Sequence, residues 1–286
     1  MRQARHKLVL SKRHRLRKPL CSTHQMPHHS CQQRNSTAHS AIQTLKDSGM
    51  PMDNETYYDE FAEWYEKERH DGYHAFIDRL ETNLILPHAA EKDVLEVGCG
   101  TGLILQRVAA VARRAVGMDL SAGMLEHAEK RGLEVVKADA TDLPFDDESF
   151  DLVYSFKVLA HVKDIDKSLA EMARVTRPGG RLILEFYNRL SLRYLAKRLA
   201  GPGKISQNTD EGAVFTRWDS PSDLIARLPS NLKLVERYGV RVLTPAAKLH
   251  RIPLIAPVLQ HAETKAAHNG VLKHFGGFLV LELQKT

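Results

Sequence analysis

The stretch Val94–Leu103, VLEVGCGTGL, is a short apolar run that breaks into three glycines, Gly98, Gly100 and Gly102. The apolar run predicts a buried strand, and the segment LILQRVAAVARR (residues 103–114) predicts a helix directly after it. A turn without side chains lets its backbone approach a ligand closely. A glycine turn between a strand and a helix therefore predicts a cofactor-binding loop in an α/β fold.

The spacing of these glycines indicates which ligand the loop holds. A dinucleotide loop has the spacing G-x-G-x-x-G, whereas the third glycine here comes one residue early. A triphosphate loop needs Gly-Lys-Ser/Thr, which this stretch lacks. The loop is therefore more typical of a cofactor that has no phosphate to be held.

Strand-like and helix-like segments alternate along the rest of the chain, as in parallel sheets joined by right-handed crossovers. Helices are predicted within residues 54–86, where Pro87 ends the second of two, and at residues 121–132 and 164–176, the last ended by residues 178–180. We predict an α/β fold: a doubly wound, mostly parallel seven-stranded sheet with helices on both faces, Rossmann-like, with the last strand antiparallel. The predicted strands are residues 93–98, 114–119, 133–139, 150–156, 181–188, 232–243 and 276–285.

The composition changes at about residue 50. Residues 1–50 hold ten lysines and arginines against one aspartate and lack apolar periodicity, which predicts a disordered basic tail. Three interpretations of the tail stay open: a transit peptide, a polyanion-binding arm, or an extension upstream of a start at Met50 or Met52.

Residues 51–286 are slightly acidic and predict one catalytic domain. Its first two helices, within residues 54–86, are expected to form a lid. Two long inserts, residues 188–229 and 244–275, are expected on the substrate side, because ligands of such sheets bind beyond the carboxyl ends of the strands.

The cysteines and the hydropathy limit the setting of the protein. Cys21 and Cys31, with His24, His28 and His29, do not match the spacing of a zinc finger, so no metal is expected. Three cysteines make no disulfide framework, and no apolar stretch approaches the roughly 20 residues of a membrane helix. We expect a cytoplasmic protein, with mitochondrial targeting by the tail as the alternative in a eukaryote.

The stretch LEVGCGTG resembles the E-x-G-x-G-x-G signature of class I S-adenosylmethionine-dependent methyltransferases, with Glu96 as its acid. FDLVYSFKVLAHV and RVTRPGGRLILEF resemble the fourth-strand and fifth-strand motifs of the same family, so the resemblance covers roughly residues 93–187. Within this family, the sequence resembles the enzymes that methylate small molecules, such as the ubiquinone and menaquinone methyltransferases. The resemblance implies S-adenosyl-L-methionine as the cofactor.

The same resemblance implies which residues bind the cofactor. Asp119, followed by Leu120, would accept hydrogen bonds from both ribose hydroxyls, and Asp139 with the amide of Ala140 would hold the adenine edge. The residues alone leave alternatives open, because Asp119 can cap the next helix and Asp139 can form an Asx-turn. The implied cofactor-binding residues are Glu96, Gly98, Cys99, Gly100, Gly102, Asp119, Leu120, Asp139, Ala140 and Ser155.

Methyl transfer is a one-step displacement, so much of its acceleration can come from holding the acceptor in line with the methyl group. A general base helps where the acceptor is a hydroxyl or an acidic carbon, and His161, just beyond the fourth strand, is the candidate. The alternative is that His161 packs against the loop. Lys157 lies at the same strand end, and Tyr57, Tyr58 and Tyr65 can close over the cofactor or pack beneath the lid.

The sequence argues against several acceptors. SFKVLA, after the fourth strand, lacks the cysteine of cytosine C5 methylation, the Asp/Asn-Pro-Pro-aromatic stretch of adenine methylation and the acids of metal-assisted catechol methylation. The acidic body argues against nucleic acid. A small molecule remains, or a protein side chain. A catalytically silent cofactor-binding protein and a nicotinamide-dependent oxidoreductase are the alternatives of another class.

The inserts indicate what kind of small molecule is bound. NRLSLRYLAKRLAG, residues 188–201, places Leu192, Leu195 and Leu199 on one helical face with basic residues elsewhere. This pattern predicts contact with a membrane surface and a lipid-like acceptor such as a quinone precursor, or else an amphipathic lid helix. The second insert is rich in Pro, Leu and Ile and can wall an apolar acceptor pocket.

Overall fold

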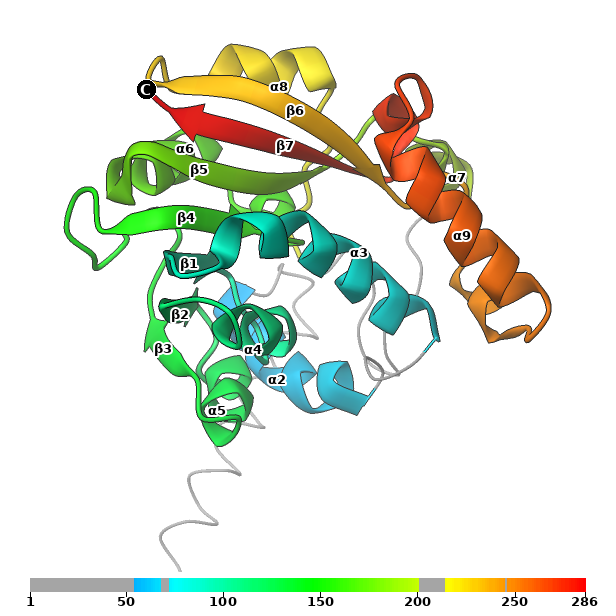
Figure 1. Cartoon of the computed structure of the whole chain (residues 1–286). Helices are drawn as coiled ribbons and strands as arrows, with labels where there is room; N and C mark the ends of the chain where they lie inside the picture. The colour runs from blue at the N-terminus through cyan, green and yellow to red at the C-terminus, as the bar shows by residue number, and fades with distance from the viewer. Residues whose placement is uncertain (1–53, 68–71, 201–213, 245) are drawn as a thin grey trace, which may run out of the picture. The chain divides into compact units, whose positions relative to one another are not determined.

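One mixed sheet organises the part of the chain that the structure describes. The computed structural model describes residues 54–67, 72–200, 214–244 and 246–286, all within the unit Pro51–Thr286. The predictions for the basic tail and its cysteines lie outside the described residues. The strands run in the order β3-β2-β1-β4-β5-β7-β6 (Figure 1). They are β1 Asp93–Val97, β2 Arg114–Asp119, β3 Glu134–Lys137, β4 Phe150–Ser155, β5 Thr176–Tyr187, β6 Leu232–Val240 and β7 Phe278–Lys285.

The strand directions confirm the predicted fold class. β1 to β5 pair in parallel, with Val94 opposite Ala115 on one side and Leu152 on the other. β7 lies between β5 and β6 and is antiparallel to both. The carboxyl ends of the parallel strands therefore meet at one edge of the sheet, where the glycine loop follows β1.

Helices cover both faces of the sheet. The α-helices are α2 Asn54–Lys67, α3 Gly72–Ala89, α4 Leu103–Ala109, α5 Ala122–Lys130, α6 Ile165–Val175, α7 Leu192–Ala200, α8 Pro221–Arg227 and α9 Ile255–His268. The 3-10 helices are η1 Leu159–His161, η2 Ala247–Arg251 and η3 Leu272–Phe275. Alternate residues of β1 enter two separate cores, since Val94 packs with α3 and α4, whereas Leu95 packs with α6 and α8. Figure 1 shows α3 and α4 in front of the sheet.

Two predicted helix ends are wrong. α3 does not end before Pro87 but continues to Ala89, because a proline in the last turn removes only one hydrogen bond and its φ suits a helix. The helix after the glycine loop ends at Ala109 rather than at residue 114. The amides of Val111 and Ala112 both turn back to the carbonyl of Val108, which frees the chain to begin β2 at Arg114.

Some predicted strand bounds also differ from the structure. β5 begins at Thr176, and the residues expected to end α6 lie inside it as a bulge, because Thr176 pairs with Phe150 and Arg181 with Leu152. β3 ends at Lys137, so Asp139 lies in the loop after it. β6 ends at Val240, because Arg241 adopts a left-handed backbone (φ 58°) that turns the chain away.

No helix within the described residues has the length and apolar character needed to cross a membrane.

Candidate cofactor and acceptor site

The glycine loop folds back on β2. The amides of Gly98 and Cys99 both donate to the carbonyl of Met118, at 2.7 and 2.9 Å. Gly98 and Gly102 have φ of 78° and 82°, and a Cβ would meet Val158 Cγ2 at 2.1 Å and Leu133 Cδ1 at 2.5 Å. Side chains are therefore excluded at both positions, and the loop keeps its tight turn.

Gly100, between them, has more room beside it than Gly98 or Gly102. Its φ is 54°, and the nearest atoms to a Cβ would be Met124 Sδ and Tyr65 Cε1, both at 4.0 Å. A small cavity of about 20 Å³ adjoins this loop, and Glu96, Cys99, Phe156 and Lys157 are among its lining residues. Gly98, Cys99 and Thr101 of the loop line this cavity, whose volume suits about one water molecule.

Asp119, the last residue of β2, is fixed beside this loop. Its Oδ2 accepts from the amide of Gly100 at 2.8 Å and its Oδ1 from the amide of Ser121 at 3.0 Å. Burial raises the pKa of Asp119, while the amides of Ser121, Gly100 and Leu120 act in the opposite direction. Each carboxylate oxygen still has a lone pair, so the two oxygens can accept hydrogen bonds from two neighbouring hydroxyls of a ligand. The predicted alternative, capping of α5, belongs to Ser121, whose Oγ accepts from Met124.

Glu96 and Cys99 are buried and chemically quiet. Glu96 Oε2 accepts from the hydroxyl of Tyr154 at 2.9 Å, and burial raises the pKa of Glu96 well above its ordinary value. Burial likewise raises the pKa of the Cys99 thiol well above its usual range. Neither side chain is arranged as a nucleophile.

The side chain of Lys157 pairs with two acids of α3. Its Nζ donates to Asp78 at 3.0 Å and to Glu81 at 2.5 Å, both on α3. Its backbone amide donates to Glu185 Oε1 at 3.1 Å. Burial, with Glu81 beside it, raises the pKa of Glu185 well above its ordinary value. The cluster ties α3 to the ends of β4 and β5.

Asp139, Ala140 and Ser155 differ in what their side chains do. Asp139 Oδ1 accepts from the amide and the hydroxyl of Thr141, at 2.7 and 2.8 Å, which is the predicted Asx-turn alternative. Ala140 is buried in the same loop. Ser155 is fully buried and donates to the carbonyl of Val97 at 2.8 Å, so its hydroxyl joins β4 to β1.

α2 is fastened across the glycine loop by acids that sequence analysis missed. Asp59 Oδ1 accepts from Ser121 Oγ at 2.5 Å and from the amide of Gly123 at 2.9 Å, at the start of α5. Glu66 forms an ion pair with Arg131. Each pair is more than sixty residues apart in the chain, so no local pattern signals it.

His161 lies where α2, β5 and the segment after α7 meet. Its Nδ1 lies 2.9 Å from the carbonyl oxygen of Phe215, and its Nε2 lies 3.4 Å from the hydroxyl of Tyr187. The ring also meets Tyr58 edge-on, with centroids 6.2 Å apart. Because a carbonyl only accepts, Nδ1 carries the hydrogen and Nε2 keeps its lone pair.

Burial lowers the pKa of His161, the carbonyl of Phe215 acts to raise it, and Arg193 and Lys197 lower it further. The imidazole is consequently neutral at pH 7 and able to take a proton at Nε2. His161 packs among aromatic rings, as the alternative interpretation expected, and its role as a base stays a prediction.

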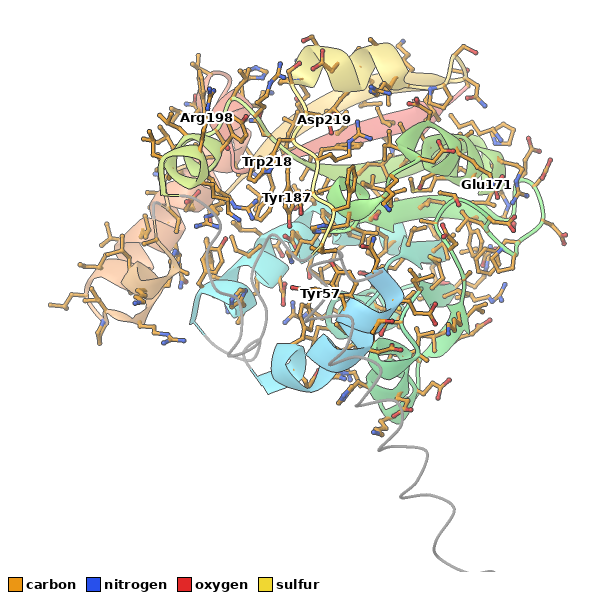
Figure 2. All side chains as sticks on the ribbon, turned by 180° about the vertical axis from the view of Figure 1, so that it is seen from behind. Tyr57, Glu171, Tyr187, Arg198, Trp218 and Asp219 are labelled. Atoms are coloured by element: carbon orange, nitrogen blue, oxygen red, sulfur yellow. The ribbon has the colours of Figure 1, made fainter. Side chains whose placement is uncertain are left out.

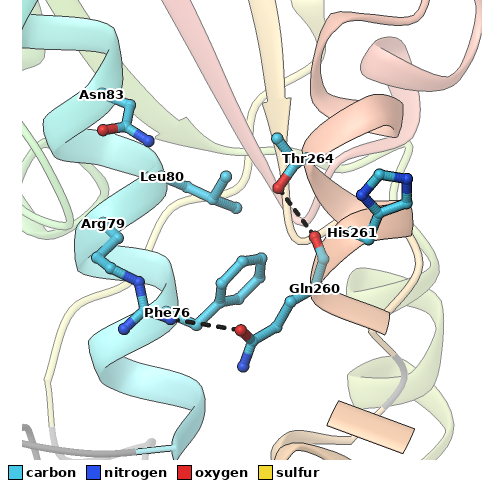
Figure 3. A pocket seen from close by; sticks show the side chains of 7 residues that line it. All are labelled: Phe76, Arg79, Leu80, Asn83, Gln260, His261 and Thr264. Atoms are coloured by element: carbon cyan, nitrogen blue, oxygen red, sulfur yellow. Dashed lines mark hydrogen bonds between the residues drawn. The ribbon is translucent and has the colours of Figure 1, made fainter. Parts of the chain in front are cut away.

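A larger hollow of about 210 Å³ lies elsewhere, between α3 and α9. Figure 3 shows Phe76 and Arg79 on α3 facing Gln260 on α9, with Arg79 donating to the Gln260 side-chain oxygen at 3.3 Å. None of the predicted site residues lines it. No aspartate or glutamate lines it either, so this hollow lacks a carboxylate that could accept from the hydroxyls of a ligand.

Comparison with known proteins identifies the family. A family model described as "Methyltransferase domain" matches residues 95–184. The demethylmenaquinone methyltransferase of Corynebacterium urealyticum is 31% identical over 166 residues, which span 54% of this chain and 72% of that protein. The chain belongs to the S-adenosylmethionine-dependent methyltransferases.

Other curated relatives match a shorter region. The demethylmenaquinone methyltransferase of Clavibacter sepedonicus is 42% identical over 108 residues, covering 36% of this chain and 44% of that protein. A probable S-adenosylmethionine-dependent methyltransferase of Mycobacterium tuberculosis is 35% identical over 109 residues, or 37% and 40% of the two chains. The chain thus spans less than half the length of these relatives.

Solved structures of this methyltransferase family share the fold. A crystal structure of an S-adenosylmethionine-dependent methyltransferase from Thermotoga maritima, a possible histamine N-methyltransferase, has a TM-score of 0.60 and 23% identity, covering 81% of this chain and 99% of that chain. A crystal structure of an S-adenosylmethionine-dependent methyltransferase from Mesorhizobium loti has a TM-score of 0.53 and 19% identity, covering 73% of this chain and 98% of that chain. S-adenosylmethionine is the cofactor of this family. A carboxylate fixed as that of Asp119 is compatible with the ribose diol of this cofactor.

Proposed function

We propose that this chain transfers the methyl group of S-adenosylmethionine to a small apolar or lipid-like acceptor. The observation that carries the proposal is the carboxylate of Asp119, which the backbone amides of Gly100 and Ser121 hold beside the glycine loop. Such a carboxylate can accept hydrogen bonds from the two neighbouring hydroxyls of a ribose. The loop also lacks the lysine that a phosphate-binding loop needs.

In this proposal the cofactor-binding residues divide into three groups. The backbone of Gly98, Cys99, Gly100 and Gly102 leaves room for the methionine arm, with Glu96 holding the loop from beneath. Asp119 and Leu120 bind the ribose, and Asp139 with Ala140 borders the adenine. Ser155 holds β4 against β1, which fixes the spacing of the loop after β1 and the loop after β4.

When bound, the cofactor supplies a methyl group on a positively charged sulfur. The chain's own part in the reaction is to hold the acceptor in line and to exclude water, which α2 does by closing over the loop. Where the acceptor carries a hydroxyl or an acidic carbon, His161 Nε2 takes the proton. The electron pair left on the acceptor would then take the methyl group that the bound cofactor supplies, and the cofactor would leave as S-adenosylhomocysteine with the electron pair of the broken carbon–sulfur bond.

The acceptor class is supported by the surroundings of His161 and by the relatives. Tyr58, Tyr187 and Trp218 surround this end of the sheet with aromatic rings, which suit a planar apolar molecule. Several relatives are demethylmenaquinone methyltransferases by name. An apolar quinol or related ring is the acceptor that both observations favour.

Calorimetry with S-adenosylmethionine and with NAD tests the proposal on the full chain. We expect the first to bind and the second not. Release of S-adenosylhomocysteine over a set of phenols, quinols, amines and carboxylic acids then identifies the acceptor. Binding of NAD alone would indicate an oxidoreductase, and cofactor binding without release over small molecules or proteins would indicate a silent binding protein.

We further propose that the two inserts contact an anionic membrane surface. The described residues of 188–200 and 246–275 contain eight lysines and arginines and one acid, Glu263, which is buried. Large aliphatic side chains stand exposed on the same segments: Leu199 is 81% exposed and Leu254 87%. Aliphatic groups beside positive charge suit the boundary of anionic headgroups and acyl chains.

Co-sedimentation with phosphatidylcholine vesicles, with and without phosphatidylglycerol, tests this contact. We expect binding only to the anionic vesicles, and Leu199→Glu with Leu254→Glu should weaken it by about tenfold or more. Val111→Glu is the matched control, because Val111 is exposed in the turn before β2, at the opposite edge of the sheet. Equal binding by the double variant and the wild type would contradict the contact.

A further inference from the structure

Arg193 of α7 lies among aromatic rings beside His161. Its Cζ is 4.4 Å from the ring centre of Tyr187, 4.5 Å from that of Phe278 and 5.0 Å from that of Trp218. These rings come from the end of β5, the start of β7 and the segment before α8. Figure 2 shows Tyr187 and Trp218 next to each other, and their ring centres are 5.1 Å apart. The guanidinium is therefore held in a fixed position by parts of the chain that are far apart in sequence.

No acid neutralises Arg193 within the described residues. Its Nε and Nη1 are buried and donate to none of the groups that the structure describes. Asp219, whose amide donates to the carbonyl of Tyr187, is already held by Arg217 through bonds of 2.8 and 2.7 Å. A guanidinium keeps its charge at any physiological pH, and aromatic faces recover only part of the cost of burying it. Within the described residues, these two buried N–H groups thus have no hydrogen-bond acceptor.

A second arginine strengthens the positive potential in this region. A Cβ on Gly277 would lie 3.1 Å from Arg193 Cδ and 3.3 Å from the carbonyl oxygen of Arg241. The Arg241 guanidinium lies 5.2 Å from the ring centre of Tyr73. Burial raises the pKa of the Tyr73 phenol, and the charges of Arg241 and Arg193 both act to lower it. Two cations therefore act on one small region at the carboxyl edge of the sheet.

We propose that Arg193 binds the ionised oxygen of the acceptor, and that the acceptor is an enol or phenol on a planar ring. The inference rests on the proposed methyl transfer and specifies its substrate class. Tyr187 connects the two groups, since its hydroxyl meets His161 Nε2 and its ring face meets Arg193. As the O–H bond breaks, the proton goes to Nε2 and the electron pair stays on an oxygen that the guanidinium neutralises. That pair, on the oxygen or on a conjugated ring carbon, then forms the bond to the methyl carbon.

A purely structural role for Arg193, as a cation packed between rings, makes a different prediction. Its loss would lower stability and would weaken charged and uncharged ring ligands equally. An anion-binding role weakens only the charged ligand. The two roles are therefore separated by a pair of ligands that differ in charge but share one ring.

The probes are 2-hydroxy-1,4-naphthoquinone, whose enol is ionised at neutral pH, and its uncharged methyl ether, 2-methoxy-1,4-naphthoquinone. Each is titrated into the full chain with S-adenosylhomocysteine present, and binding is followed by calorimetry and by quenching of tryptophan fluorescence. We expect the wild type to bind the anion about tenfold or more tighter than the ether. Arg193→Met should abolish this preference, and Arg193→Lys should keep part of it.

Arg198→Met is the matched control, because Arg198 is an exposed cation on the same helix, and it should keep the full preference. An equal preference in the wild type and in Arg193→Met would overturn the inference, as would a preference lost only in Arg241→Met. If Arg193→Met lowers the melting temperature strongly, Arg193→Lys supplies the comparison. Failure of the chain to bind S-adenosylmethionine would instead overturn the proposed function, so the two failures are distinguishable.

Discussion

At the scale of the residue, Gly100 shows how one position can be tested for binding apart from folding. Gly100 and Gly132 both have a left-handed backbone, with φ of 54° and 75°, and neither would place a Cβ within 3.4 Å of another atom. Alanine at either position should therefore cost a similar amount of stability, about 1 kcal/mol. Only Gly100 borders the proposed cofactor, so only Gly100→Ala should weaken S-adenosylmethionine binding in calorimetry, by about tenfold. Equal affinities of the two variants would show that the site is elsewhere.

His161 makes a prediction about pH. Its pKa lies below the ordinary value near 6.5, because burial disfavours the charged ring. The base is active when neutral, so kcat/KM should rise with pH through a midpoint below 6.5 and then level off. His161→Gln should remove this acid limb and lower kcat by about a hundredfold or more. A profile that keeps its acid limb in His161→Gln would assign the titration to another group.

At the scale of the element, α2 depends on one carboxylate. Asp59 accepts two hydrogen bonds at the start of α5, where a negative charge also suits the positive end of the helix. Asp59→Ala should loosen α2, weaken cofactor binding several-fold and speed hydrogen exchange in residues 54–67. Glu55→Ala is the control, because the ion pair of Glu55 with Lys137 is half exposed and contributes little. Unchanged exchange in Asp59→Ala would contradict the lid.

The elements also show what sequence can and cannot predict. The glycine loop and Asp119 were predictable, because strand, turn and acid follow one another within a single βαβ unit. The bulge at Gly179 was not, since it depends on where Phe150 of the neighbouring strand pairs. Asp59 and Arg193 were not identified as site residues either. Their partners lie on segments distant in sequence, and only the folded sheet brings these segments to one edge.

At the scale of the whole molecule, the predicted site and an ion network lie at opposite edges of the sheet. The predicted site lies at the carboxyl ends of the strands, whereas Asp93, Arg113, Asp151 and Arg177 form an ion network near their amino ends. Arg113 lowers the pKa of Asp93. Burial acts to raise the pKa of Asp151, but the amide of Asp93 and the guanidinium of Arg177 outweigh it and lower that pKa. Carboxyls with a lowered folded pKa stabilise the fold above their unfolded pKa near 3.9, and this stabilisation is lost as pH falls through the folded value.

Asp151→Asn should therefore lower the melting temperature by about 2 to 4 °C at pH 7. The decrease should be smaller at pH 3, because pH 3 lies below the unfolded pKa near 3.9, where this stabilisation is reduced. Because the network is remote from the glycine loop, the affinity for S-adenosylmethionine at pH 7 should stay within about twofold of the wild type. Thermal unfolding at both pH values and calorimetry at pH 7 measure these effects. If Asp151→Asn keeps the melting temperature but no longer binds S-adenosylmethionine, the network does not serve stability alone. Part of the binding site would then lie at the amino edge of the sheet.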